Sequence, residues 1–238
     1  MNLLALDTST EFLSLALQLN GKLFTHTQLA GNASSELILP QIQALLEAAN
    51  VKLNDLDGIA FGAGPGAFTG VRIACGVAQG LGFGANLPVV GVNTLLALAE
   101  ASGEDHVIAC MDARMGEIYH AAFEKINGEW IEKSTTQVCK PEAAPMLAAG
   151  ASQMMIQEKA WVGVGSGWVA YAEILRNIYA QNLTKTLANI TPTAEAILKL
   201  AKPVFKAGLA KPASEAAPIY VRNRVALTSL EREQGMRL

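Results

Sequence analysis

Positive charge is scarce in this sequence. Its 18 lysine and arginine residues are outnumbered by 21 aspartate and glutamate residues, which gives a net charge of −3 and an isoelectric point near 5.7. A chain of this charge has little general attraction for the phosphate backbone of RNA or DNA. If the protein acts on nucleic acid, another subunit has to supply most of the basic surface.

Cysteine and long apolar runs are scarce as well. Cys75, Cys110 and Cys139 are widely spaced and odd in number, so we expect buried reduced thiols and no disulfide framework. Mean hydropathy is +0.27, yet no uninterrupted apolar run approaches the roughly 20 residues that span a bilayer. The N-terminus shows no basic stretch followed by a cleavage-like site, which predicts a cytoplasmic protein without a signal peptide.

Apolar residues make up 51% of the 238 positions, enough for large buried cores. The elements predicted for the first half are strands at 3–6, 12–19 and 22–29, a helix from Ser34, a strand at 57–62, a helix at 67–84, a strand at 88–92 and a helix at 94–101. Asn20-Gly21 is a strong hairpin signal between the second and third strands. This order is that of a ribonuclease H-like lobe, the repeated unit of the actin, sugar kinase and Hsp70 (ASKHA) superfamily.

The second half repeats this pattern in shorter form. Its predicted elements are strands at 107–111, 118–123, 130–137 and 161–165 and helices at 168–179 and 193–206, with Asn127-Gly128 as a second hairpin turn. The predicted fold is therefore α/β, with two ribonuclease H-like lobes of mixed sheets flanked by helices. The predicted boundaries are 1–102 for the N-terminal lobe, 103–217 for the shorter C-terminal lobe and 218–238 for a tail that packs between or onto the lobes.

The segment from Phe61 to Gly76 carries the densest signal. An apolar strand ends in Gly64-Pro65-Gly66 and opens directly into a helix, so the turn either presents N–H groups to an anion or lets two backbones approach closely. The motif G-x-G-x-x-A fits formally, but it follows the fourth strand and no acidic residue stands about twenty positions on. Lysine is absent, which excludes a Walker A loop. A structural turn, an anion site and a partner contact remain open.

The segment Asp7 to Thr10 lies where this superfamily has its first phosphate-binding loop. No glycine stands between the two flanking strands, which weakens the case for a nucleotide. Because aspartate is common in turns, a turn or capping role for Asp7 is favoured over a catalytic one. A residual nucleotide or anion contact would involve Asp7, Thr8, Ser9, Gly64 and Gly66.

Other chemistry-bearing residues form no recognisable site. The three histidines lack the i, i+4 spacing that places two imidazoles on one helical face, so we expect no metal site. Asp112, Arg114 and Glu117 form a charged group between two predicted strands, where a solvated hairpin turn is favoured over a role in the cleft between the lobes. No pair of nucleophile and base is evident.

The predicted helix at 67–84 is built of small residues. They recur every four positions along two ridges, which are Gly76, Gly80 and Gly84, and Gly70, Ala74, Ala78 and Gly82. Each interior glycine costs about 1 kcal/mol of helix stability relative to alanine, so close packing has to offset the loss. We expect one ridge to face the lobe's own sheet and the other to face a partner. The first helix also has more apolar positions than one buried stripe requires.

Four segments resemble signatures of the TsaB family, also called YeaZ, of bacterial threonylcarbamoyladenosine biosynthesis proteins. They are residues 4–10, 35–40, 64–73 and 112–117. The most specific is Gly-Pro-Gly-x-Phe-Thr-Gly-x-Arg, from Gly64 to Arg72. The resemblance covers the first 120 residues well and the remainder loosely. Ser35 stands where many relatives have histidine, and no catalytic assignment depends on it.

The resemblance implies two lobes whose catalytic apparatus has decayed. The related subunit TsaD keeps a metal-binding His-x-x-x-His pattern, which this chain lacks, and transfers threonylcarbamoyl to the adenosine next to the anticodon of tRNAs that read codons beginning with A. TsaB-like proteins bind TsaD through their first two helices and act with the ATPase TsaE. The resemblance therefore implies ATP and metal on the partner subunits and no cofactor on this chain alone. From the charge and the apolar runs described above, we expect tRNA contact only through the complex and no membrane contact. When the chain is alone, we expect a homodimer, because the same apolar helical surface can pair with itself.

Three functions follow from this reading: a non-catalytic TsaD-binding subunit, an active ATPase or phosphotransferase of the ASKHA superfamily, and a peptidase. A phosphotransferase should have a glycine in its first phosphate loop, and a peptidase needs a nucleophile or a metal, so the first function is favoured. The residues predicted to contact the partner lie on the first two helices and are Leu39, Ile42, Leu45, Leu46, Thr69, Arg72, Gly76 and Gly80.

Overall fold

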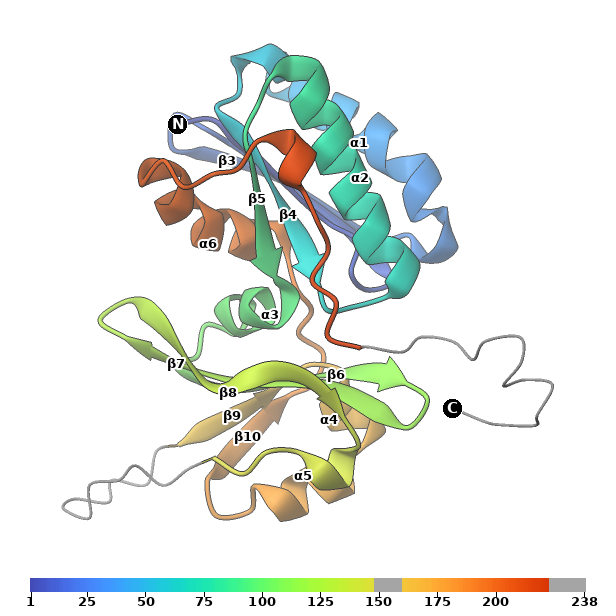
Figure 1. Cartoon of the computed structure of the whole chain (residues 1–238), viewed down its shortest axis with the longest axis vertical. Coiled ribbons are helices and arrows are strands. Elements are labelled where there is room, and N and C mark those ends of the chain that lie inside the picture. The colour runs from blue at the N-terminus through green and yellow to red at the C-terminus, as the bar shows by residue number, and fades with distance from the viewer. Residues whose placement is uncertain (148–159, 223–238) are drawn as a thin grey trace.

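Each half of the chain folds into a five-stranded mixed sheet, which confirms the predicted pair of ribonuclease H-like lobes (Figure 1). The computed structural model describes residues 1–147 and 160–222. The strand order is β3-β2-β1-β4-β5 in the first sheet and β10-β9-β6-β7-β8 in the second. In each sheet an antiparallel meander of three strands is extended by two parallel strands, so the second sheet repeats the topology of the first.

The elements of the first half are β1 (Leu3–Asp7), β2 (Phe12–Leu19), β3 (Lys22–Leu29), α1 (Ser34–Ala48), β4 (Gly58–Gly64), α2 (Phe68–Ala85), β5 (Val89–Asn93) and α3 (Thr94–Ser102). Those of the second half are β6 (His106–Arg114), β7 (Glu117–Ile126), β8 (Glu129–Cys139), β9 (Trp161–Val164), α4 (Gly167–Ala170), α5 (Ala172–Ile178), β10 (Leu183–Leu187) and α6 (Ala194–Lys206). None of the described helices combines the length and hydropathy needed to cross a bilayer.

The central strand β1 is buried on both faces because helices cover each side of the first sheet. Leu4 and Leu6 belong to the core beneath α1 and α2. Leu3 and Ala5 point to the opposite face and pack against α6. A strand covered on both faces reads as a continuous apolar run and not as an alternating one, as Leu-Leu-Ala-Leu does here.

The position of α6 differs from the prediction. The helix was predicted correctly in sequence, but within a C-terminal lobe of residues 103–217. In the structure α6 packs across β1, β2, β4 and β5 of the first sheet, and its core includes Ile197, Ala201 and Phe205. Figure 1 shows the chain returning from the second lobe to cover the first. The first lobe therefore contains two separate parts of the chain.

In the second half one local prediction was wrong and one strand was not predicted. The helix expected over 168–179 is two short helices, since the backbone at Tyr171 leaves the helical region with φ −131° and ψ 35°. Strand β10 was not predicted, because Leu-Thr-Lys-Thr-Leu is an edge strand with exposed Thr184 and Lys185 and has no apolar run. Both predicted hairpin turns are confirmed, with positive φ at Asn20-Gly21 and Asn127-Gly128.

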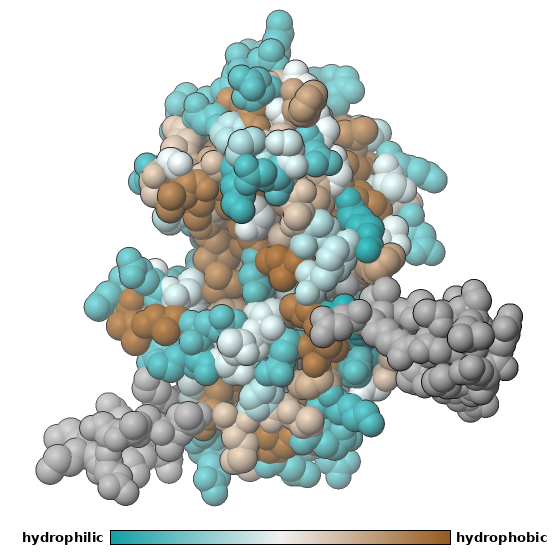
Figure 2. Space-filling view, viewed as in Figure 1, coloured by the Kyte–Doolittle hydropathy of each residue, from teal (hydrophilic) through white to brown (hydrophobic). Residues whose placement is uncertain are grey.

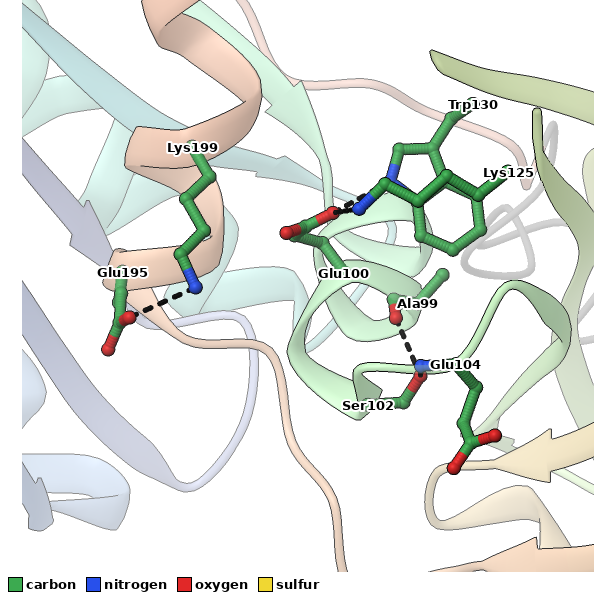
Figure 3. Close-up of polar contacts among 8 residues, drawn as sticks. All are labelled: Ala99, Glu100, Ser102, Glu104, Lys125, Trp130, Glu195 and Lys199. Atoms are coloured by element: carbon green, nitrogen blue, oxygen red, sulfur yellow. Dashed lines mark hydrogen bonds and ion pairs between the residues drawn. The ribbon is translucent and has the colours of Figure 1, made fainter. Parts of the chain in front are cut away.

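Helix α3 joins the two lobes. Leu95 and Leu98 pack into the core of the second sheet, although α3 directly follows the last strand of the first sheet. At its C-terminal end the Glu100 carboxylate accepts from Lys125 Nζ at 2.7 Å and from Trp130 Nε1 at 2.8 Å, both from the β7–β8 hairpin (Figure 3). Apolar packing and a partly buried ion pair thus fix the lobes to each other.

Candidate partner interface

The glycine-rich turn before α2 serves close backbone approach. A Cβ at Gly66 would lie 2.5 Å from the carbonyl oxygen of Ser9, and a Cβ at Gly70 would overlap the carbonyl oxygen of Thr8. The amide of Ala67 donates to the Ser9 carbonyl at 2.8 Å, and the Thr8 hydroxyl donates to the Gly70 carbonyl at 2.6 Å. The glycines therefore let the β1–β2 loop lie directly against the start of α2. Of the alternatives left open by the sequence, this structural one is observed.

The same packing removes the predicted anion contact at the β1–β2 loop. Asp7, Thr8 and Ser9 are each no more than 1% exposed, and Gly64 is buried as well. A phosphate could not reach these groups without displacing α2. The prediction of a residual nucleotide or anion contact was therefore wrong for these four residues, while Gly66 is half-buried.

Asp7 has a turn role, as favoured from the sequence. Its Oδ2 accepts from the Ser9 amide at 3.1 Å and from the Ser9 hydroxyl at 2.8 Å, which closes a local turn. Burial raises the pKa of Asp7 to about 6, although the two hydrogen bonds act in the opposite direction. Its other oxygen fills the space beside Gly62, where a Cβ would overlap it.

Helix α2 presents its two small-residue ridges to different surroundings. The residues of the inner ridge are buried, namely Gly70, Ala74, Ala78 and Gly82. The residues of the outer ridge, which are Gly76, Gly80 and Gly84, are exposed. A Cβ added at any of these three glycines would meet no other atom within 4 Å. Internal packing thus explains the small residues of the inner ridge, but it does not explain those of the outer ridge.

An exposed stripe runs the length of α2 along the outer ridge. It consists of Thr69, Arg72, Gly76, Gly80 and Phe83, which are all exposed, Phe83 to 77%. Near its C-terminal end the stripe is hollowed into a shallow depression beside Phe83 and Ser214. The four residues predicted on this helix as partner contacts are therefore accessible.

On helix α1, only two of the four residues predicted to contact a partner are accessible. Leu39 is 51% exposed and Leu46 is half-buried, so both can be reached by a partner. Ile42 and Leu45 are only 3% and 8% exposed because they pack into the core beneath the helix. The prediction of these two residues as contacts was wrong, since side chains already covered by the chain's own core add no new buried surface.

A C-terminal strap, defined here as residues 207–222, borders the other side of α2 (Figure 1). Lys211 bridges to the edge strand β5 through Val89, with N···O distances of 2.7 and 2.9 Å. Further along, the amide of Ile219 donates to the Ala63 carbonyl at 2.7 Å. Residues 207–217 were predicted within the C-terminal lobe, and their pairing with β5 was missed because it joins segments that are distant in sequence. The predicted tail at 218–238 lies outside the described residues beyond residue 222.

The last described residue of the strap, Arg222, contacts the β6–β7 hairpin of the second lobe. Arg222 pairs with Glu117 and donates to the Ala113 carbonyl at 3.1 Å. The turn itself is Met115-Gly116, and Asp112 and Arg114, which form an ion pair at 3.3 Å, lie at the end of β6. The favoured hairpin turn is thus confirmed, and Glu117 also takes part in a contact that reaches the strap.

A pocket of about 320 Å³ opens where the strap crosses between the lobes. Figure 2 shows apolar residues exposed on this face at the junction. Arg72 lies beside the pocket, with its guanidinium 3.3 Å from the Phe68 ring centroid and 4.9 Å from the Tyr220 ring centroid. The residues lining this junction pocket are Pro65, Gly66, Phe68, Val71, Tyr119, Ile219, Tyr220, Val221 and Arg222.

The surroundings of His120 and of the three cysteines indicate structural roles for these side chains. The ring of His120 is buried, and its Nε2 lies 2.8 Å from the hydroxyl of Tyr179. Burial raises the pKa of the Cys75, Cys110 and Cys139 thiols, which makes each a poorer nucleophile. Within residues 1–147 and 160–222, no three His, Cys, Asp or Glu side chains converge as metal ligands would.

Comparisons with known proteins agree with this architecture. The family model described as TsaD, tRNA N6-adenosine threonylcarbamoyltransferase, matches residues 25–229. The protein of Escherichia coli K12 named tRNA threonylcarbamoyladenosine biosynthesis protein TsaB is 37% identical, with 97% of this chain and 98% of that protein covered. The Haemophilus influenzae protein of the same name is 39% identical, with 94% and 95% covered.

Solved structures give the same relationship. YeaZ from Pseudomonas aeruginosa has a TM-score of 0.77 and 36% identity, covering 92% of this chain and 99% of that chain. A second Pseudomonas aeruginosa structure, described as similar to peptidase YeaZ, has a TM-score of 0.82 and 38% identity, covering 93% and 99%. With sequence, topology and near-complete coverage in agreement, the chain belongs to the TsaB (YeaZ) family.

Proposed function

We propose that this chain is a non-catalytic subunit that binds a TsaD-like enzyme. In the proposed complex the partner transfers threonylcarbamoyl to the adenosine next to the anticodon of tRNAs that read codons beginning with A. The close relatives named as tRNA threonylcarbamoyladenosine biosynthesis proteins support the pathway. The geometry of α2 supports the role of partner-binding subunit within that pathway.

The outer ridge of α2 is the observation that carries the proposal. Gly76 and Gly80 lie in the interior of the helix, where each glycine costs about 1 kcal/mol relative to alanine. Within the described chain nothing approaches Gly76, Gly80 or Gly84 closely enough to require the missing Cβ. Small residues that are not needed for internal packing are expected where another helix has to come close. Leu39, Leu46 and Phe83 add exposed or half-exposed apolar surface beside the ridge.

The alternative of an active ATPase or phosphotransferase is disfavoured by the surroundings of Asp7. In this superfamily the first loop has to meet a phosphate, whereas Asp7 is 1% exposed and bonded to Ser9. The packing of Leu95 and Leu98 and the Glu100 ion pair also oppose movement of one lobe against the other. Catalytic ATP and metal are therefore placed on the partner subunits in this proposal.

The peptidase alternative lacks a catalytic base. Among the described residues, the side-chain hydrogen bonds of the three histidines go to Gln28, Glu124 and Tyr179, and none joins a histidine to a serine or cysteine nucleophile.

The proposal extends to the other partners. A TsaE-like ATPase completes the complex, and tRNA is contacted only through the assembly, in keeping with the net charge of −3. When the TsaD-like subunit is absent, the same exposed face of α2 pairs with a second copy, because a C2 dimer can bury one surface against itself.

Placing arginine on the outer ridge tests the proposal. Gly80→Arg should weaken binding to the purified TsaD-like subunit roughly a hundredfold or more, because the side chain holds the helices apart and buries an unpaired charge. Reconstituted threonylcarbamoylation of tRNA should fall with it. Binding is measured by isothermal titration calorimetry.

The matched control introduces the same side chain elsewhere. Asn177→Arg lies on the exposed face of α5 in the second lobe and should leave binding unchanged. Circular dichroism should show both variants folded, since open space surrounds Gly80. A folded Gly80→Arg protein with native affinity for the partner would refute the proposed interface.

A further inference from the structure

The exposed stripe of α2 does not end at the helix. At its N-terminal end Phe68 and Arg72 lie at the junction pocket, whose opposite wall is the strap. At its C-terminal end the shallow depression beside Gly80 is also bordered by the strap, through Ser214. The strap therefore borders the stripe at both ends, and the junction pocket continues the same surface.

The rim of the junction pocket is apolar and accessible. Phe68 is 53% exposed, Tyr220 is 58% exposed and Ile219 is 37% exposed. Neighbouring exposed aromatic and aliphatic side chains around a cavity are typical of a binding surface, in which a few residues near a pocket contribute most of the affinity. A volume of about 320 Å³ can take one large apolar side chain.

Arg72 adds a fixed positive charge beside the pocket. Its Nη1 donates to the Phe68 carbonyl at 3.1 Å, and its guanidinium stacks on the Phe68 ring and faces the Tyr220 ring. Within residues 1–147 and 160–222 it forms no ion pair, so it can still bind a carboxylate. Held by these contacts, the side chain loses little freedom on binding.

We propose that the strap and the junction pocket form a second part of the interface with the TsaD-like subunit. The pocket receives one aromatic or branched apolar side chain of that subunit, and Arg72 pairs with a carboxylate next to it. This inference rests on the proposed function, because it assigns the same partner to a surface continuous with the outer ridge of α2.

Two substitutions test the strap and the charge separately. Tyr220→Ala removes one wall of the pocket, and Arg72→Gln removes the charge while keeping a donor. Each should raise the Kd for the purified TsaD-like subunit about tenfold, as expected for anchor residues of an interface. Val169→Ala, at a position 64% exposed on α4, is the control and should leave the Kd unchanged. Tyr220 is exposed, so its truncation should leave the fold intact.

Hydrogen exchange gives a second, mutation-free readout. Amides of residues 213–222 in the wild-type chain should exchange more slowly once the partner is bound, whereas amides of β10 should not change. Unchanged strap exchange together with native affinity of Tyr220→Ala would overturn the inference, and loss of binding in Gly80→Arg would then leave the proposed function standing. If Tyr220→Ala weakens only self-association, the pocket belongs to a homodimer and the inference is also wrong.

Discussion

Asp7 and His120 are buried groups whose pKa values are shifted in opposite directions. Burial raises the pKa of Asp7 to about 6 and lowers the pKa of His120 to about 4. The Tyr179 hydroxyl donates to the Pro145 carbonyl at 2.7 Å, so its oxygen accepts the Nε2–H of His120. Because its pKa is lowered to about 4, the imidazole is neutral near pH 7, with its proton on Nε2.

These two groups should change the free energy of unfolding with opposite signs between pH 4 and pH 6. Folded Asp7 keeps a proton that the unfolded group, with a pKa of 3.8, has released, so its contribution falls as pH rises. Unfolded His120, with a pKa of 6.5, binds a proton that the folded group does not, so its contribution falls as pH drops. At about 1.4 kcal/mol per pKa unit, each effect is about 3 kcal/mol, and the two nearly cancel.

Single variants should separate the two effects in urea denaturation from pH 4 to pH 6.5. Asp7→Asn leaves His120 in place, so stability should rise with pH by about 3 kcal/mol. His120→Gln leaves Asp7 in place, so stability should fall with rising pH. Parallel profiles for the two variants and the wild-type chain would show that neither buried group titrates as described.

At single positions, the chemical role of a residue was easier to predict from the sequence than the solvent exposure of its side chain. The turn role of Asp7 follows from its residue type and its place after a strand, and the structure confirms it. The burial of Ile42 and Leu45 could not be predicted, because α1 has apolar residues on more than one face. Which face meets the sheet depends on the rotation of the helix, and one sequence does not determine that rotation.

At the scale of elements, the two ridges of α2 should respond oppositely to the same substitution. Gly80→Ala should raise the free energy of unfolding of the isolated chain by about 1 kcal/mol, because alanine favours the helix and its Cβ meets open space. Gly82→Ala should lower it, because its Cβ would lie 3.0 Å from the Ala213 Cβ and from the Leu87 carbonyl oxygen. Urea denaturation at concentrations too low for self-association measures both.

The partner assay adds a second comparison. If the outer ridge exists for close helix approach, Gly80→Ala should stabilise the isolated chain and still weaken partner binding. Equal changes in stability for Gly80→Ala and Gly82→Ala would mean that the ridges do not differ in their surroundings.

Elements with an apolar pattern were predicted almost completely, and elements held by backbone pairing were not. The meander from β1 to β3 has alternating residues and an Asn-Gly turn, so its position and pairing are readable from the sequence. Strand β10 and the strap have no such pattern, and they depend on β9 and β5 as neighbours. The strap pairs with a strand more than a hundred residues earlier, and β10 pairs with β9 across two helices, so local periodicity contains no information about either pairing.

At the scale of the whole molecule, the Glu100 contact should hold the lobes together. Its side chain is 13% exposed and accepts from Lys125 and Trp130 across the junction (Figure 3). Glu100→Ala should lower the free energy of unfolding by about 1 to 3 kcal/mol, because it leaves a partly buried ammonium and an indole N–H without their acceptor. Guanidinium denaturation followed by tryptophan fluorescence measures the loss.

Figure 3 also shows the matched control. The Glu195–Lys199 pair on α6 is exposed on both sides and joins residues of one helix. Glu195→Ala should change stability by less than about 0.5 kcal/mol. If Glu195→Ala lowered the free energy of unfolding as much as Glu100→Ala, the junction contact would stabilise the fold no more than an exposed ion pair.

The return of α6 to the first sheet determines when that lobe can finish folding during synthesis. The Ala194 amide donates to the Ser14 hydroxyl at 2.9 Å, across 180 positions of sequence. As the ribosome extends the chain, all five strands of the first sheet emerge long before the helix that covers Leu3 and Ala5. The apolar face of this sheet stays exposed until α6 has been made, so during that time it can bind chaperones or aggregate. The lobe that is translated first is therefore completed last.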